Sequence, residues 1–124
     1  MRWPVAEWRW RDWAVQELAA APQSRAFVRV VLGPLLDYDA RHHGDLVRTV
    51  ETLAACGWSP SRAARRLFLL RNSVLYRRGR IEEICGRALD APEQRLLLEL
   101  AVAVHRVHRH AGALEGHNMS EVTP

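Results

Sequence analysis

Apolar residues recur at helical spacing along most of this sequence, which predicts a chain built mainly of helices. The pattern predicts a first well-defined helix that Ser24 caps and that ends at Gly33, and a short second helix opened by Pro34. Asp45 is expected to cap a strongly amphipathic helix, and Gly57 is expected to end it. The apolar positions of that helix are Leu46, Val50, Leu53 and Ala54.

Two more helices are expected in close succession. Ser59-Pro60 places a hydroxyl at the N-cap and a proline at the first helical position of the stretch "PSRAARRL". The link "FLL" then leads to a longer helix from Arg71 to about Cys85, which Gly86 can stop. A short helix, a tight link and a longer helix are typical of a helix-turn-helix.

Small and apolar side chains occupy the positions that such a unit needs. Ala63 and Ala64 are small where the two helices must cross closely. The apolar residues expected to fix this crossing are Leu67, Leu69, Val74 and Ile81. Asp90 and Glu93 have the spacing of a capping box and are expected to open a last helix. Its apolar stripe (Leu97, Leu100, Val104 and Val107) fits either the core or an interface between two copies.

The two ends of the chain differ from its middle. Residues 1–22 contain four of the five tryptophans and are expected to be the tail of a preceding regulatory domain or a helix packed on the main body. An amphipathic segment lying on a membrane surface is the alternative for this lead. Residues 111–124 show little periodicity and are expected to form a flexible tail, which leaves 23–110 as the domain itself.

Positive charge is concentrated on the two helices of the expected helix-turn-helix. Residues 59–87 hold eight arginines against two glutamates, a net charge of +6, whereas the rest of the chain holds ten arginines against twelve acidic residues, a net charge of −2. A solvated face is the ordinary explanation of such a charge run. The basic residues are all arginine, however, and the planar guanidinium suits phosphate and guanine.

The start of the second helix carries the residue types that read DNA bases. In a helix-turn-helix this end enters the major groove, so Arg71 can pair with guanine and Asn72 with adenine, while Ser73 can reach a base or a phosphate. We call Arg71–Ser73 the reading end. The residues expected to hold flanking phosphates are Ser61, Arg62, Tyr76, Arg77 and Arg80.

Several segments, taken in order, resemble a known family. They are "LGPLLDYD" at 32–39, "SRAARRL" at 61–67, "RNSVLYR" at 71–77, "RIEEI" at 80–84 and "DAPEQRLLLELA" at 90–101. Together they resemble the C-terminal helix-turn-helix domain of PucR-type bacterial transcriptional regulators, which include purine-catabolism and sugar-diacid regulators. The DNA-binding unit is also similar to that of the Fis nucleoid protein. The resemblance implies a compact all-α domain, sequence-specific binding to double-stranded DNA at the nucleoid in the cytoplasm, and a sensor region outside this chain.

This sequence departs from the family pattern at the second helix. Where the family typically has "HRNTLRYRLRRIEEL", this chain has "LRNSVLYRRGRIEEI". Leu70 and Leu75 replace polar residues, and Arg78 stands where an apolar core residue is usual. Gly79 lies inside the helix at a cost of roughly 1 kcal/mol relative to alanine. The link also lacks a glycine and has Phe68 there instead.

The remaining candidate chemistry is sparse. Cys56 and Cys85 are expected to be reduced thiols of a cytosolic protein, and His105 and His108 have no acidic or cysteine partner at a spacing that would suggest a metal. The sequence has no phosphate loop, GxGxxG or nucleophile elbow, so we expect no enzyme, no cofactor and no small-molecule ligand. No apolar run approaches the roughly 20 residues that span a bilayer, so no membrane partner is expected.

Because one short helix reads few base pairs, a homodimer is expected, with half-sites roughly 34 Å apart. The alternative to a DNA reader is a helical protein-interaction or dimerisation module whose arginines bind an acidic partner.

Overall fold

Six helices follow one another along the part of the chain that the structure, a computed structural model, describes. That part is residues 9–122, with side chains described over residues 9–113. In chain order the helices are α1 (Trp10–Ala20), α2 (Ser24–His42), α3 (Leu46–Ala55), α4 (Pro60–Leu67), α5 (Arg71–Cys85) and α6 (Pro92–Val122). The predicted all-α class is confirmed, since every regular element in residues 9–122 is a helix.

Helix α2 is continuous where the sequence predicts two helices. Pro34 lies inside it, so the expected break at Gly33 is wrong. A proline within a helix removes one backbone hydrogen bond, but here the apolar residues on both sides of it are buried and hold the helix together. They are Val28, Val31, Leu32 and Leu35. Ser24 is the first residue of α2 rather than its cap, and its hydroxyl donates to the carbonyl of Ala19 at 2.8 Å.

The start of α3 is capped from α2. Asp45 occupies the N-cap position as predicted, but its side chain makes no capping hydrogen bond. Asp39 supplies the cap instead, because its carboxylate accepts hydrogen bonds from the amides of Leu46 at 2.9 Å and Val47 at 3.0 Å. A Cβ at Gly44 would lie 2.6 Å from Asp39 Oδ1, so this close approach requires glycine. Helices α2 and α3 are therefore joined by both the chain and a side-chain cap.

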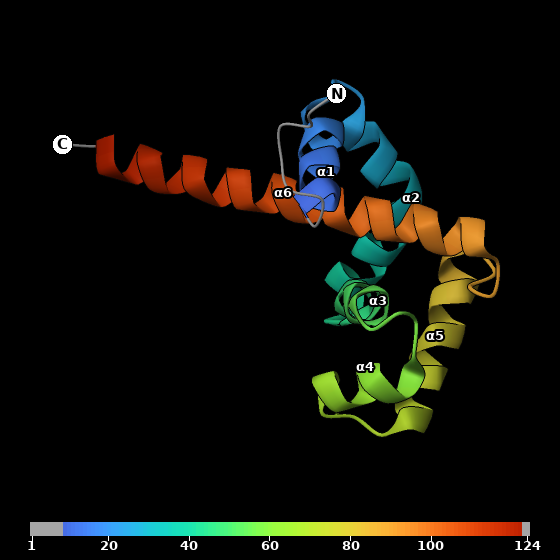
Figure 1. Cartoon of the computed structure of the whole chain (residues 1–124). Coiled ribbons are helices and arrows are strands. Elements are labelled where there is room, and N and C mark those ends of the chain that lie inside the picture. Colours follow the sequence, from blue (N-terminus) through green and yellow to red (C-terminus); the bar gives the residue numbers. More distant parts are fainter. Residues whose placement is uncertain (1–8, 123–124) are drawn as a thin grey trace, which may run out of the picture.

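Helix α6 lies across α1, α2 and α3, and the core forms beneath it (Figure 1). Its fully or nearly fully buried residues are Leu98, Ala101, Val102 and Val104. Of the predicted stripe, Val104 is in the core and Val107 packs against it, whereas Leu97 and Leu100 are half-buried. The apolar face of α6 therefore packs into the core. Its buried residues Leu98 and Ala101 each lie one position after the predicted Leu97 and Leu100.

The two ends of the described chain are both helical. Helix α1 packs against α6 and α2 through Val15, and the rings of Trp10 and Trp13 meet edge to face at 5.4 Å. Trp3 and Trp8, which also belong to the predicted lead, lie outside the described residues. The backbone of 111–122 continues α6 beyond the rest of the molecule (Figure 1). The flexibility of 111–124, and the origin of 1–22 in a preceding domain, stay predictions.

Candidate nucleic-acid interface

Helices α4 and α5 begin and end where the local sequence predicts. Ser59 caps α4, and its hydroxyl accepts a hydrogen bond from the amide of Arg62 at 3.3 Å, with Pro60 as the first helical residue. Phe68 ends α4 in the left-handed conformation, with φ of 56°, and Gly86 ends α5 in the same way, with φ of 65°. The left-handed cap costs little for glycine but is unfavourable for phenylalanine.

The crossing of α4 and α5 has the predicted core. Ala63 and Ala64 are buried, which lets the two helices approach closely. Val74 and Ile81 are fully buried on the inner face of α5, and the link residue Leu69 packs against the same cluster. The amide of Leu69 also donates to the carbonyl of Ala64 at 2.9 Å, which fixes the link. Helices α4 and α5 thus form a helix-turn-helix.

The reading end lies on the outside of this unit. Arg71 and Asn72 are exposed, and Ser73 is half-buried. Because a helix turns by about 100° per residue, positions two residues from Val74 face away from the core. Asn72 and Tyr76 hold these positions, and Tyr76 is 71% exposed. The structure therefore places three of the predicted DNA-binding residues on the surface of α5 that is free to meet another molecule.

The arginines of the basic window divide into two groups, of which the first is unpaired. Arg62, Arg65 and Arg66 on α4 and Arg71 on α5 are exposed. Within residues 9–113, their side chains have no ion pair and no hydrogen bond to another residue. Ser61 is exposed beside Arg62 in the first turn of α4. The uncompensated positive charge therefore covers α4 and the first turn of α5.

The second group of arginines is engaged within the domain. Arg77 Nη1 donates to Thr49 Oγ1 at 3.2 Å and lies 3.7 Å from a carboxylate oxygen of Asp45. Arg80 pairs with Glu83 at 2.8 Å, and its guanidinium lies 5.4 Å from the centre of the Tyr38 ring. Arg77 and Arg80, both predicted to hold phosphates, thus already have partners on α2, α3 and α5.

The contacts of Arg78 explain why this position departs from the family pattern. Its side chain is only 18% exposed, and its guanidinium pairs with Asp90 Oδ1 at 2.5 Å. The arginine therefore fills a mostly buried position with its aliphatic stem and reaches the loop before α6 with its charged end. Asp90 is used by this pair, and α6 begins at Pro92, so the predicted capping box of Asp90 and Glu93 is wrong. Spacing along the sequence could not reveal this partner.

Apolar side chains are also exposed at the link. Phe68 is 93% exposed and Leu70 is 78% exposed. Leu70 is the N-cap residue of α5, directly before Arg71, and gives that helix no side-chain capping bond. The helix-turn-helix thus presents apolar groups next to its unpaired arginines.

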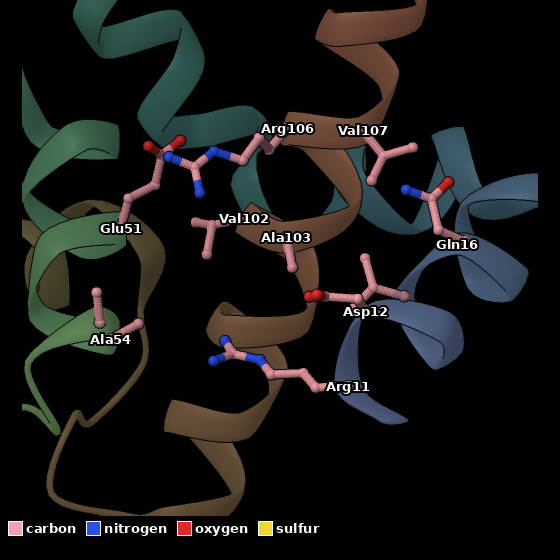
Figure 2. A pocket seen from close by; sticks show the side chains of 11 residues that line it. Arg11, Asp12, Gln16, Glu51, Ala54, Val102, Ala103, Arg106 and Val107 are labelled. Carbon is pink, nitrogen blue, oxygen red and sulfur yellow. The ribbon is translucent and has the colours of Figure 1, made fainter. Parts of the chain in front are cut away.

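The other candidate groups lie apart from this surface. A groove of about 440 Å³ runs between α1, α3 and α6, and Figure 2 shows Val102 and Ala103 beside the charged ends of Arg11 and Arg106. Among the described residues, no group of three or more histidine, cysteine or acidic side chains is placed to hold a metal, and no helix is long and apolar enough to cross a bilayer.

Both cysteines are free thiols. Cys56 is buried, and burial raises the pKa of the Cys85 thiol, with a smaller opposing effect from Arg87. A raised pKa keeps Cys85 protonated and poorly nucleophilic near neutral pH.

Comparison with known proteins finds a family that is similar to the segment containing the helix-turn-helix. Residues 46–104 match the PucR C-terminal helix-turn-helix domain. An uncharacterized protein in the pkwA 5′ region of Thermomonospora curvata is 36% identical over 89 residues, covering 72% of this chain and 49% of that protein. The purine catabolism regulatory protein of Bacillus subtilis (strain 168) is 40% identical over 47 residues, covering 38% of this chain and 9% of that protein. No solved structure matches.

The chain thus spans about half the length of the first relative and about a tenth of the second. The matched residues run from the start of α3 into α6 and include all of α4 and α5. The family match and the regulator relative support a DNA-binding regulatory role. Residues 46–104, just under half of the chain, are thus similar to the PucR C-terminal helix-turn-helix domain.

Proposed function

We propose that this chain recognises a specific sequence in double-stranded DNA, with the start of α5 in the major groove and α4 along the backbone. The observation that carries this proposal is the group of four exposed arginines on α4 and the first turn of α5, whose side chains have no partner within residues 9–113. Unpaired arginines on one surface are an electrostatic footprint for phosphate. A purely solvated charge run does not explain why the same surface also exposes Asn72 at the helix start.

The polar residues of this surface have separate roles in the arrangement. Arg71 donates its fork to guanine, Asn72 pairs with adenine, and Ser73 reaches a base or a phosphate. The residues assigned to phosphates are Ser61, Arg62, Arg65, Arg66 and Tyr76, and the backbone amide of Ser61 in the first turn of α4 can donate as well. Arg77 and Arg80 join them only by exchanging Thr49 or Glu83 for a phosphate oxygen.

The domain is proposed to act as a homodimer at the nucleoid, as the DNA-binding part of a transcription regulator whose sensor lies elsewhere. A single reading end contacts only a few base pairs, so two copies on half-sites roughly 34 Å apart give a longer operator. Sedimentation of the chain with a selected duplex measures the stoichiometry, and two chains per duplex is the expected value.

Selection from a library of random-sequence duplexes tests whether the chain binds DNA with sequence specificity. We expect one sequence to be enriched. We also expect the logarithm of the binding constant to fall linearly with the logarithm of the salt concentration. The double variant Arg71→Ala, Asn72→Ala should lose the preference and at least about tenfold in affinity, because a bidentate base contact is worth about 1–3 kcal/mol.

A matched control separates base reading from net charge. Arg25 and Arg29 are exposed on the first turns of α2, which begins at the end of the molecule opposite α4 (Figure 1). Replacing both by alanine should leave the enriched sequence unchanged. If no sequence is enriched and the reading-end variant binds like the wild type, the proposal fails. Binding of acidic peptides in place of duplex DNA would instead favour a protein-interaction module.

A further inference from the structure

Leu70 is the residue directly before the reading end. Its backbone is extended, with φ of −74° and ψ of 150°, and its carbonyl accepts hydrogen bonds from Ser73 at 3.0 Å and Val74 at 3.2 Å. These bonds hold the Leu70 backbone in the first turn of α5. Its side chain is nevertheless 78% exposed and therefore contributes little to the core. Leu70 is thus an apolar group held in a fixed place beside Arg71.

Neither folding nor helix capping explains a leucine at this position. N-cap positions favour serine, threonine, aspartate and asparagine, whose side chains accept a hydrogen bond from the first-turn amides. Leucine has no acceptor, and α5 indeed has no side-chain capping bond. Exposure of a large apolar side chain to water is also unfavourable. Leucine at this position neither caps the helix nor removes its side chain from water. We therefore infer that its side chain makes a contact only when the domain is bound to DNA.

The major groove offers one apolar group that a leucine can contact, which is the C5-methyl group of thymine. Other base edges in that groove present hydrogen-bond donors and acceptors, which an apolar side chain would leave unpaired. Because Leu70 directly precedes Arg71, a thymine contacted by Leu70 lies next to the base pair that Arg71 reads.

We propose that Leu70 is a specificity-determining residue that selects thymine through its methyl group. This inference rests on the proposed function, because it requires the start of α5 to lie in the major groove. It identifies one feature of the operator, a thymine whose methyl group contributes to affinity, at a position adjacent to the contact of Arg71.

Deoxyuridine provides the test, because it differs from thymidine only in lacking this methyl group. In the duplex obtained by selection, each thymine is replaced in turn by deoxyuridine, and the dissociation constant is measured by fluorescence anisotropy. One replacement should weaken wild-type binding roughly fourfold, the change expected for removing one methyl group from an apolar contact. The same replacement should have no effect on the Leu70→Ser variant.

Leu70→Ser also guards against loss of folding as an explanation. Serine can cap α5, so this variant should melt at or above the wild-type temperature while it loses the methyl dependence. Phe68→Ala is the matched control, because it removes another exposed apolar side chain from the same link. The control should keep the full fourfold penalty for deoxyuridine.

The outcomes separate this inference from the proposed function. If a sequence is enriched but no thymine shows a methyl dependence that Leu70→Ser removes, the role of Leu70 is wrong and the proposed function stands. If both Leu70→Ser and Phe68→Ala remove the dependence, the link acts as a general apolar surface and the assignment to Leu70 is also wrong. If no sequence is enriched, both proposals fail.

Discussion

Trp58 Nε1 donates a 2.6 Å hydrogen bond to Glu99 Oε1, which joins the segment before α4 to the first third of α6. Trp58 is 7% exposed, although it lies in the left-handed conformation with φ of 64°. The guanidinium of Arg95 lies 5.7 Å from the centre of the indole ring. The indole therefore joins the segment before α4 to α6, in addition to the direct packing of α4 against α3 and α5.

Replacing Glu99 should destabilise the domain through this indole. Glu99→Ala leaves a buried donor without its acceptor and is expected to lower the free energy of unfolding by about 1–3 kcal/mol. Glu99→Gln keeps an oxygen acceptor, so its free energy of unfolding should fall clearly less than that of Glu99→Ala. Urea denaturation measures both values, and equal losses for the two variants would show that the hydrogen bond is not the cause.

Gly79 should be replaceable with a gain in stability. It lies inside α5, and a Cβ at this position would meet nothing within 4 Å. Gly79→Ala is therefore expected to raise the free energy of unfolding by about 1 kcal/mol, since alanine loses less backbone entropy on folding. Gly86→Ala is the control, because φ at Gly86 is +65° and alanine is strained there. Thermal melts should show the two substitutions shifting the midpoint in opposite directions.

Arg62 and Arg77 should differ in their effect on the salt dependence of DNA binding. Arg62 is unpaired within the described residues, so Arg62→Ala should lower the slope of log affinity against log salt by about 0.9, the value for one phosphate contact on B-DNA.

Arg77 donates to the fully buried Thr49, so Arg77→Ala should mainly lower stability, with little change in that slope. Salt titrations of affinity and urea denaturation of both variants distinguish the two roles. A slope change of about 0.9 in Arg77→Ala would show that Arg77 leaves Thr49 for a phosphate when DNA binds.

The stability of the domain should fall when the pH drops below about 6.5. Burial lowers the pKa of His105, the nearby charge of Arg109 lowers it further, and Glu51 partly opposes both. His105 therefore binds a proton more readily in the unfolded chain than in the folded one. The free energy of unfolding is highest above the pKa of His105 in the unfolded chain, and it decreases as the pH falls toward the pKa in the folded chain. His105→Gln should flatten this pH dependence, whereas substitution of the exposed His110 should not.

The parts of the fold that sequence reasoning predicted correctly are those with local causes. Ser59-Pro60 and Gly86 act on their own helix ends, so the start of α4 and the end of α5 lie where the pattern predicts. Helix α2 was predicted wrongly because burial on both sides of Pro34, a tertiary effect, outweighs the local preference for a break.

The site shows the same division between local and distant causes. Exposure of Asn72 and Tyr76 follows from their two-residue spacing to the buried Val74, which a sequence pattern contains. The pairing of Arg77 and Arg78 does not, because Thr49 and Asp90 lie 28 and 12 residues away in the sequence. Counting arginines therefore overestimates the charge available to DNA, and only the packing of α5 against its neighbours separates free arginines from paired ones.

The cap that Asp39 places on α3 bears on where a shortened version of this protein could begin. The family match starts at Leu46, between Asp39 and the amides it caps. A fragment that begins at that boundary would keep both helices of the helix-turn-helix. It would lose the Asp39 cap of α3 and the buried Leu32 and Leu35 of α2. We therefore expect the smallest part of the chain that folds by itself to be larger than the stretch matched by the family and to include α2, which begins at Ser24.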